Sequence, residues 1–137
     1  MEERAVPDTT TPPLILIIDD EPELEVMARY LELEGYSVLT ASNGEEGLLA
    51  LASCRKPCIV LLDLMMPVMD GYGFLRRLHD DATLCGLPVF VLTASFQTER
   101  MAGVVGLLRK PLHMELLLEA VAPYCPPPGE KETSTAG

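Results

Sequence analysis

The chain has 137 residues, of which 48% are apolar, and a formal net charge of -11 at pH 7. This length and apolar content suit one compact domain with its own core and are too small for two. The negative charge repels phosphate backbones and anionic lipids, which argues against direct nucleic-acid binding and against binding to a membrane surface.

The two ends of the chain differ in composition from its middle. Residues 1–12 are acidic and rich in Pro and Thr, and residues 125–137 are rich in Pro, Ser and Thr, so we predict disordered tails around one domain at 13–124. The start lacks the basic and apolar regions of a signal peptide, and no apolar run is long enough to cross a bilayer. We therefore expect a cytoplasmic protein, and Met1 with its two tails favours a stand-alone chain.

Apolar segments of strand length alternate with segments of helical periodicity. In chain order, the predicted elements are strand 14–18, helix 22–35, strand 36–40, helix 44–54, strand 58–62, helix 72–80, strand 88–92, strand 104–108 and helix 113–124. The strands are rich in branched apolar residues, and Asn43 is a suitable cap for the second helix. This alternation predicts right-handed βαβ units around a parallel sheet, an α/β fold.

The four cysteines match no common metal or redox pattern. They are Cys54, Cys58, Cys85 and Cys125, and they form neither a CxxC pair nor a zinc ribbon. A reducing compartment would keep them as thiols. We therefore expect structural thiols, with a redox or metal role for Cys54 and Cys58 as the weaker alternative.

Polar side chains stand where the predicted parallel strands end. Asp19 and Asp20 follow the first strand, Asp63 the third, Thr93 the fourth, and Lys110 lies just beyond the fifth. In an open parallel sheet, ligands bind at the carboxyl ends of the strands near the reversal of strand order. Clustered carboxylates need a neutralising cation, and oxygen ligands suit Mg²⁺. The sequence therefore predicts a magnesium site at this edge.

The same residues describe phosphoryl transfer to a carboxylate. Asp63 stands alone at the centre and would be the nucleophile, while the metal and Lys110 offset negative charge and the Thr93 hydroxyl donates to a phosphoryl oxygen. Any one acidic residue could simply cap a helix or turn. Five suitable groups at the right strand ends favour a site over that interpretation.

The sequence resembles the receiver domain of two-component response regulators over roughly residues 13–124. The resemblance rests on LILIIDDEPE, VLLDLMMPVMDGYGFL, VLTA and RKP, in this order and at approximately the family spacing. It implies a flavodoxin-like (βα)5 doubly wound sheet with strand order 2-1-3-4-5. It also implies a signalling domain rather than an enzyme, with a histidine kinase or phosphotransfer protein upstream and a protein partner downstream.

The resemblance assigns a role to each candidate residue. Asp63 would be the phosphoacceptor, Thr93 the switch hydroxyl, and Lys110 the ligand of a phosphoryl oxygen. The implied Mg²⁺ ligands are Asp19, Asp20, Asp63 and the backbone carbonyl of Met65.

Two features of the chain between Thr93 and Lys110 depart from the family pattern. Only sixteen residues separate Thr93 from Lys110, so we predict a shortened fourth helix of about one turn, or an irregular crossover. Leu107 stands where the family usually has Tyr or Phe, which argues against an aromatic switch signal. Both departures favour the main alternative, a phosphorylation-independent receiver that acts as a protein-interaction module.

Two enzyme classes fit less well. A haloacid-dehalogenase-type phosphatase needs a second acid two residues after its nucleophilic Asp, where this chain has Met65. A nucleotide enzyme needs a Gly-rich loop after the first strand, where this chain reads DDEPE.

Overall fold

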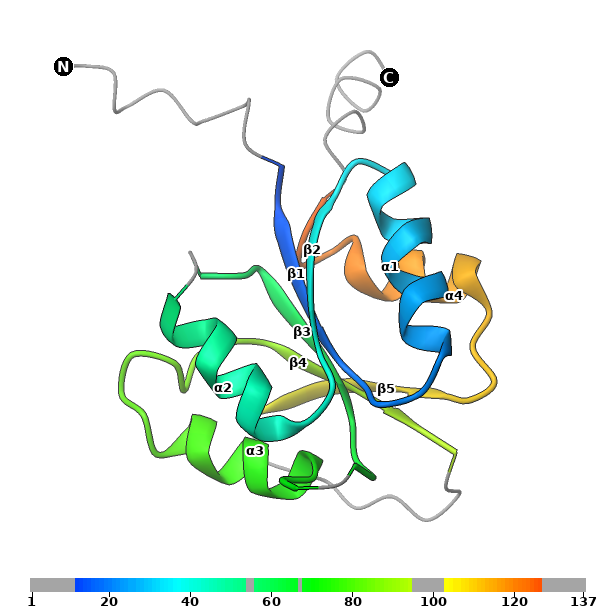
Figure 1. Cartoon of the computed structure of the whole chain (residues 1–137). Helices are drawn as coiled ribbons and strands as arrows, with labels where there is room; N and C mark the ends of the chain where they lie inside the picture. The colour runs from blue at the N-terminus through cyan, green and yellow to red at the C-terminus, as the bar shows by residue number, and fades with distance from the viewer. Residues whose placement is uncertain (1–11, 54–55, 67, 95–102, 127–137) are drawn as a thin grey trace, which may run out of the picture.

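The computed structural model describes residues 12–53, 56–66, 68–94 and 103–126. Five parallel strands form one sheet in the order β2-β1-β3-β4-β5, as predicted (Figure 1). The strands are β1 (Leu14–Ile18), β2 (Ser37–Ala41), β3 (Ile59–Asp63), β4 (Val89–Thr93) and β5 (Val104–Arg109).

The predicted strand positions are confirmed, with ends shifted by one residue in four strands. Asp63 and Thr93 belong to the paired part of the sheet, where Asp63 lies opposite Leu92 and Thr93 lies opposite Arg109. Asp63 and Thr93 are therefore the last residues of β3 and β4 rather than the first residues after them.

Among the described residues, two helices cover each face of the sheet (Figure 1). They are α1 (Glu23–Leu33), α2 (Gly44–Ser53), α3 (Gly71–His79) and α4 (Met114–Val121). Alternation along the buried strand β1 separates the two cores: Ile15 and Ile17 pack with α1 and α4, whereas Leu16 and Ile18 pack with α2 and α3. The predicted short helix between β4 and β5 falls at residues 95–102, outside the described residues.

Local polar contacts start two of the helices. Asn43 Oδ1 accepts a hydrogen bond from the Glu46 N–H at 2.9 Å, which confirms its predicted role as a cap. Asp70 Oδ1 accepts from the Gly73 N–H at 3.0 Å and caps α3 directly after the loop that follows Asp63. These caps fix the direction in which the chain leaves the carboxyl edge of the sheet.

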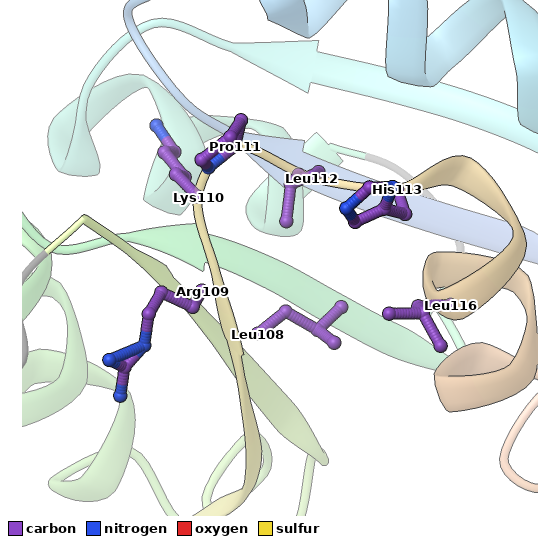
Figure 2. Close-up of a pocket in the computed structure, with 7 residues that line it drawn as sticks. All are labelled: Leu108, Arg109, Lys110, Pro111, Leu112, His113 and Leu116. Atoms are coloured by element: carbon purple, nitrogen blue, oxygen red, sulfur yellow. The ribbon is translucent and has the colours of Figure 1, made fainter.

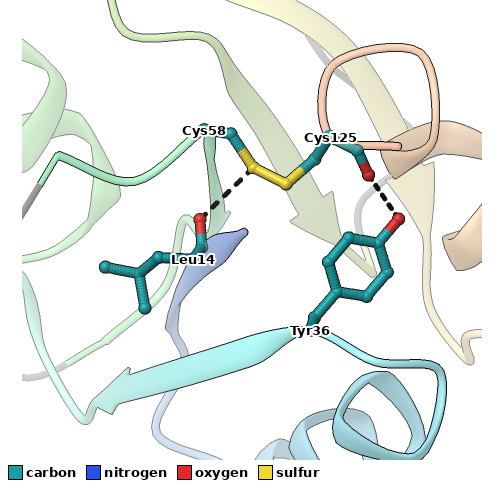
Figure 3. The surroundings of a disulfide bond; sticks show 4 residues. All are labelled: Leu14, Tyr36, Cys58 and Cys125. Atoms are coloured by element: carbon teal, nitrogen blue, oxygen red, sulfur yellow. Dashed lines mark hydrogen bonds between the residues drawn. A yellow bond between two sulfur atoms is a disulfide. The ribbon is translucent and has the colours of Figure 1, made fainter. Parts of the chain in front are cut away.

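Cys58 and Cys125 form a disulfide, so the expectation of thiols is wrong for these two residues (Figure 3). They are 67 residues apart in sequence, and the fold brings their Cα atoms to 5.6 Å, a proximity that cysteine spacing could not reveal. The Tyr36 hydroxyl donates to the Cys125 carbonyl, and Cys125 is 1% exposed. Packed structure therefore extends through Cys125, one residue beyond the predicted domain end at 124.

The other two cysteines do not take part in this bond. Cys85 is an exposed free thiol, and Cys54 lies outside the described residues.

An aromatic ring covers β5 from the neighbouring strand. Phe90 on β4 lies opposite Gly106, and a Cβ at Gly106 would meet the Phe90 ring at 2.3 Å. The Phe90 ring also makes an edge contact with Tyr124, with 6.3 Å between ring centroids. Glycine at 106 is therefore required for Phe90 to pack over the edge strand.

Replacing Val68 with Asn or Gly is expected to raise the free energy of unfolding by about 1 kcal/mol. Val68 is 78% exposed and has φ of 68°, a left-handed conformation that strains a β-branched residue. Urea unfolding of both variants measures the gain in the free energy of unfolding. Val68→Ala is the control, because it removes the β-branch but keeps the Cβ. Equal or lower stability of the Asn and Gly variants relative to the wild type would contradict the interpretation of strain.

Candidate functional site

Five of the predicted site residues lie at the carboxyl ends of β1, β3, β4 and β5. Asp19 follows β1, Asp63 and Thr93 end β3 and β4, and Lys110 follows β5. Asp19, Asp63 and Thr93 are buried, while Asp20 is exposed. The backbone N–H of Lys110 donates to the Thr93 carbonyl at 2.8 Å, which fixes the lysine backbone beside β4.

Three carboxylates form a candidate metal site. Ligand oxygens of Asp19, Asp20 and Asp63 all lie within 4.8 Å of one another. Asp19 Oδ2 is buried and lies 3.1 Å from Lys110 Nζ without a well-aligned hydrogen bond, so this oxygen depends on cationic partners. This donor set fits Mg²⁺, which takes one or two carboxylates and keeps its other positions for water and phosphate oxygens. When bound, the ion would offset charge that develops on a phosphoryl group.

Lys110 is the positive centre of the site. Its Nζ lies 3.1 Å from Asp19 Oδ2, 3.6 Å from Asp63 Oδ1, 3.3 Å from Glu21 Oε1 and 2.6 Å from Glu23 Oε2. The Lys110 side chain is 9% exposed, so these charges interact with weaker screening than surface pairs. Its ammonium partly neutralises the carboxylates that would otherwise repel one another.

Met65 contributes its backbone rather than its side chain. The Met65 N–H donates to the Asp63 carboxylate, whereas the thioether side chain is 71% exposed. The hydrogen bond constrains a carboxylate that lines a pocket of about 330 Å³. The pocket is lined by Glu21, Glu23, Asp63, Met65, Ala94, Lys110 and Pro111.

Burial shifts the acidity of both central carboxylates. Burial raises the pKa of Asp19 from 3.8 to about 6, although the Glu21 N–H at 2.9 Å and Lys110 both lower it. Burial also raises the pKa of Asp63, against the opposing effects of Lys110 and the Met65 N–H. For Lys110, burial lowers the pKa, but the contacts with Glu23 and Asp19 outweigh burial and raise it above its usual value. The lysine therefore stays charged.

The stability of the metal-free protein is expected to fall as pH rises from about 4 to about 6 through the ionisation of Asp19. Asp19 binds its proton more tightly in the folded state than in the unfolded chain, so deprotonation in this window favours unfolding. Urea unfolding across the window measures the slope, and Asp19→Asn removes this contribution. A wild-type slope no different from that of Asp19→Asn would contradict the raised pKa.

The site includes two acidic residues that the sequence analysis did not assign to it, Glu21 and Glu23, and both contact Lys110. Glu23 is the first residue of α1, and its carboxylate makes the shortest of the four contacts with Lys110. The sequence shows the run of acidic residues after β1. It does not show that the first turn of α1 places the Glu23 carboxylate beside Lys110, which follows β5.

A second pocket lies beside Lys110, between β5 and α4 (Figure 2). Its volume is about 350 Å³. Leu108 and Leu116 point toward one another across it, while the Arg109 side chain extends away from them (Figure 2). The full lining comprises Leu108, Arg109, Lys110, Pro111, Leu112, His113 and Leu116. An apolar recess therefore adjoins the lysine that contacts Asp63.

Comparisons of the sequence with known proteins agree on one family. A family model described as the response regulator receiver domain matches residues 15–122. Protein PilH from Pseudomonas aeruginosa is 38% identical over 113 residues, which cover 78% of this chain and 93% of PilH. The DNA-binding dual master transcriptional regulator RpaA from Synechocystis is 37% identical over 115 residues, which cover 80% of this chain and 47% of RpaA.

Solved structures share the fold. The chemotaxis protein CheY4 from Vibrio cholerae superposes with a TM-score of 0.76 at 27% identity, covering 83% of this chain and 99% of that one. A CheY-like response regulator receiver domain protein from Methanospirillum hungatei gives a TM-score of 0.72 at 26% identity, covering 90% and 99% of the two chains. In the described part of this chain, no helix is long and apolar enough to cross a membrane.

Proposed function

The chain belongs to the response regulator receiver family, and from this premise we propose that it accepts a phosphoryl group on Asp63 in two-component signalling. The observation that carries the proposal is the position of Lys110, whose ammonium lies 3.1 Å from Asp19 and 3.6 Å from Asp63 beside an open pocket. Such a cation can neutralise an incoming phosphoryl group without a conformational rearrangement of the backbone.

In the proposed reaction, an Asp63 carboxylate oxygen attacks the phosphorus of a phosphohistidine or of acetyl phosphate. The new P–O bond forms as the bond to the leaving group breaks, and the product is an aspartyl phosphate. Lys110 contacts a phosphoryl oxygen, and the Thr93 hydroxyl donates to another. Asp19, Asp20, Asp63 and the Met65 carbonyl would hold Mg²⁺.

We propose a histidine kinase or phosphotransfer protein as donor, since this partner follows from the family. The apolar recess between β5 and α4 adjoins Lys110 and would provide the downstream protein contact. A net charge of -11 supports protein partners rather than direct contact with nucleic acid. In this proposal the domain is a signalling phosphoacceptor, and its only catalysis is the gain and loss of its own phosphoryl group.

We place the protein in the cytoplasm. A reducing cytosol opposes the disulfide that the structure shows between Cys58 and Cys125 and would favour its reduced form. Cys58 precedes the first residue of β3 and Asp63 is the last, so the disulfide and the phosphorylation site lie at opposite ends of that strand. Phosphorylation is therefore expected in both redox states.

The chemical nature of the phosphate linkage tests this proposal. The protein is incubated with radiolabelled acetyl phosphate and Mg²⁺, and the label is then challenged with hydroxylamine, which cleaves acyl phosphates but not phosphoesters. We expect label that requires Mg²⁺ and that hydroxylamine releases. A folded protein that takes up no label, beside a reactive receiver domain as control, would support the phosphorylation-independent interaction module instead.

A further inference from the structure

Glu23 makes the tightest contact with the lysine of the site. The Glu23 Oε2 lies 2.6 Å from Lys110 Nζ, compared with 3.1 Å for Asp19 and 3.6 Å for Asp63. The Lys110 ammonium is thus drawn toward α1 and away from the carboxylate that would be phosphorylated. None of the motifs in the sequence assigns Glu23 a role.

The fold stabilises Glu23 in this position. Glu23 is the first residue of α1, where the positive end of the helix dipole favours a carboxylate. Its Oε2 is buried and has no well-aligned hydrogen-bond donor among the described residues, so the ion pair with Lys110 is its main compensation. The lysine is constrained on its side by the backbone hydrogen bond to Thr93.

An ammonium group has three N–H donors, and four carboxylates surround this one in the described part of the chain. A phosphoryl group on Asp63 would add further anionic oxygens on the Asp63 side of the lysine. Lys110 cannot keep its full contact with Glu23 and also donate fully to the phosphoryl oxygens. The two acceptors therefore compete.

We propose that Glu23 is a positioning residue that holds Lys110 toward α1 in the resting protein and competes with the phosphoryl group for its ammonium. This inference rests on the proposed phosphorylation of Asp63. It predicts that loss of the Glu23 charge releases Lys110 in the resting state and strengthens binding of a phosphoryl group.

The test compares Glu23→Gln with Glu25→Gln. Glu25 is exposed in the first turn of the same helix and is not among the four carboxylates that contact Lys110, so the control removes the same charge without this contact. The first readout is hydrogen exchange of the Lys110 ammonium with water, followed by ¹H–¹⁵N NMR without metal. The sequence has three lysines, so the Lys110 ammonium signal can be assigned with Lys56→Arg and Lys131→Arg, which remove the other two signals. We expect exchange several-fold faster in Glu23→Gln and unchanged in Glu25→Gln.

The second readout is the affinity for beryllofluoride with Mg²⁺, a stable mimic of a phosphoryl group on a carboxylate. We expect several-fold tighter binding to Glu23→Gln than to Glu25→Gln. Equal ammonium exchange in the two variants, or binding to Glu23→Gln that is no tighter, would overturn the inference. A wild type that forms neither the beryllofluoride adduct nor an acyl phosphate would instead contradict the proposed function, and ammonium exchange alone would then decide whether Glu23 holds Lys110.

Discussion

Replacing Lys110 with Met is expected to lower the free energy of unfolding by about 3 kcal/mol at neutral pH in metal-free buffer. The substitution removes the cation and leaves Asp19, Asp63 and Glu23 partly buried without their common counter-charge. Uncompensated buried carboxylates must either stay charged at high cost or take up protons. Urea unfolding of the wild type and the variant measures the difference.

Mg²⁺ is expected to restore part of the stability of Lys110→Met, because a divalent cation among Asp19, Asp20 and Asp63 replaces some of the lost positive charge. The matched control is Lys56→Met, which removes the same charge at an exposed position. If Lys110→Met were as stable as Lys56→Met, the lysine would not be the electrostatic centre of the site.

Reduction of the disulfide between Cys58 and Cys125 is expected to cost about 4 kcal/mol of stability. The bond closes a loop with a sequence separation of 67 residues, so it restricts the unfolded chain strongly. It also ties the residue before β3 to the segment after α4, where Tyr36 donates to the Cys125 carbonyl.

This effect is measured by urea unfolding with and without dithiothreitol. The Cys85→Ser background removes the exposed thiol and limits exchange of disulfide partners. The matched control carries Cys58→Ala and Cys125→Ala and should not respond to the reductant. Equal unfolding midpoints of the oxidised and reduced protein would show that the bond adds no stability.

The sheet and most of the site could be predicted from the sequence because each depends on local patterns. β1 is entirely buried, and its uninterrupted LILII run gives a direct signal for a central parallel strand. Asp63 follows a similar run, so its place at a strand end could be inferred without coordinates. The resemblance to receiver domains then gave the strand order, which predicts that these strand ends lie side by side at one edge of the sheet.

Features that depend on tertiary proximity could not be predicted in the same way. The disulfide joins residues that no spacing rule connects, and Glu23 contacts Lys110 because the fold brings the first turn of α1 and the segment after β5 to the same edge of the sheet. Leu107 argued against an aromatic switch signal from β5, and the sequence did not show that Phe90 on β4 covers this strand in the space left by Gly106. In each case the sequence shows the residues but not which residues they contact in the fold.

The most direct test of the central claim is the intact mass of the protein after incubation with acetyl phosphate and Mg²⁺. Wild type and Asp63→Asn are compared with Asp80→Asn, an exposed control at the end of α3. We predict one phosphate adduct on the wild type and on Asp80→Asn, its absence from Asp63→Asn, and its loss when Mg²⁺ is chelated. An adduct of equal yield on Asp63→Asn would contradict the assignment of Asp63 as the phosphoacceptor.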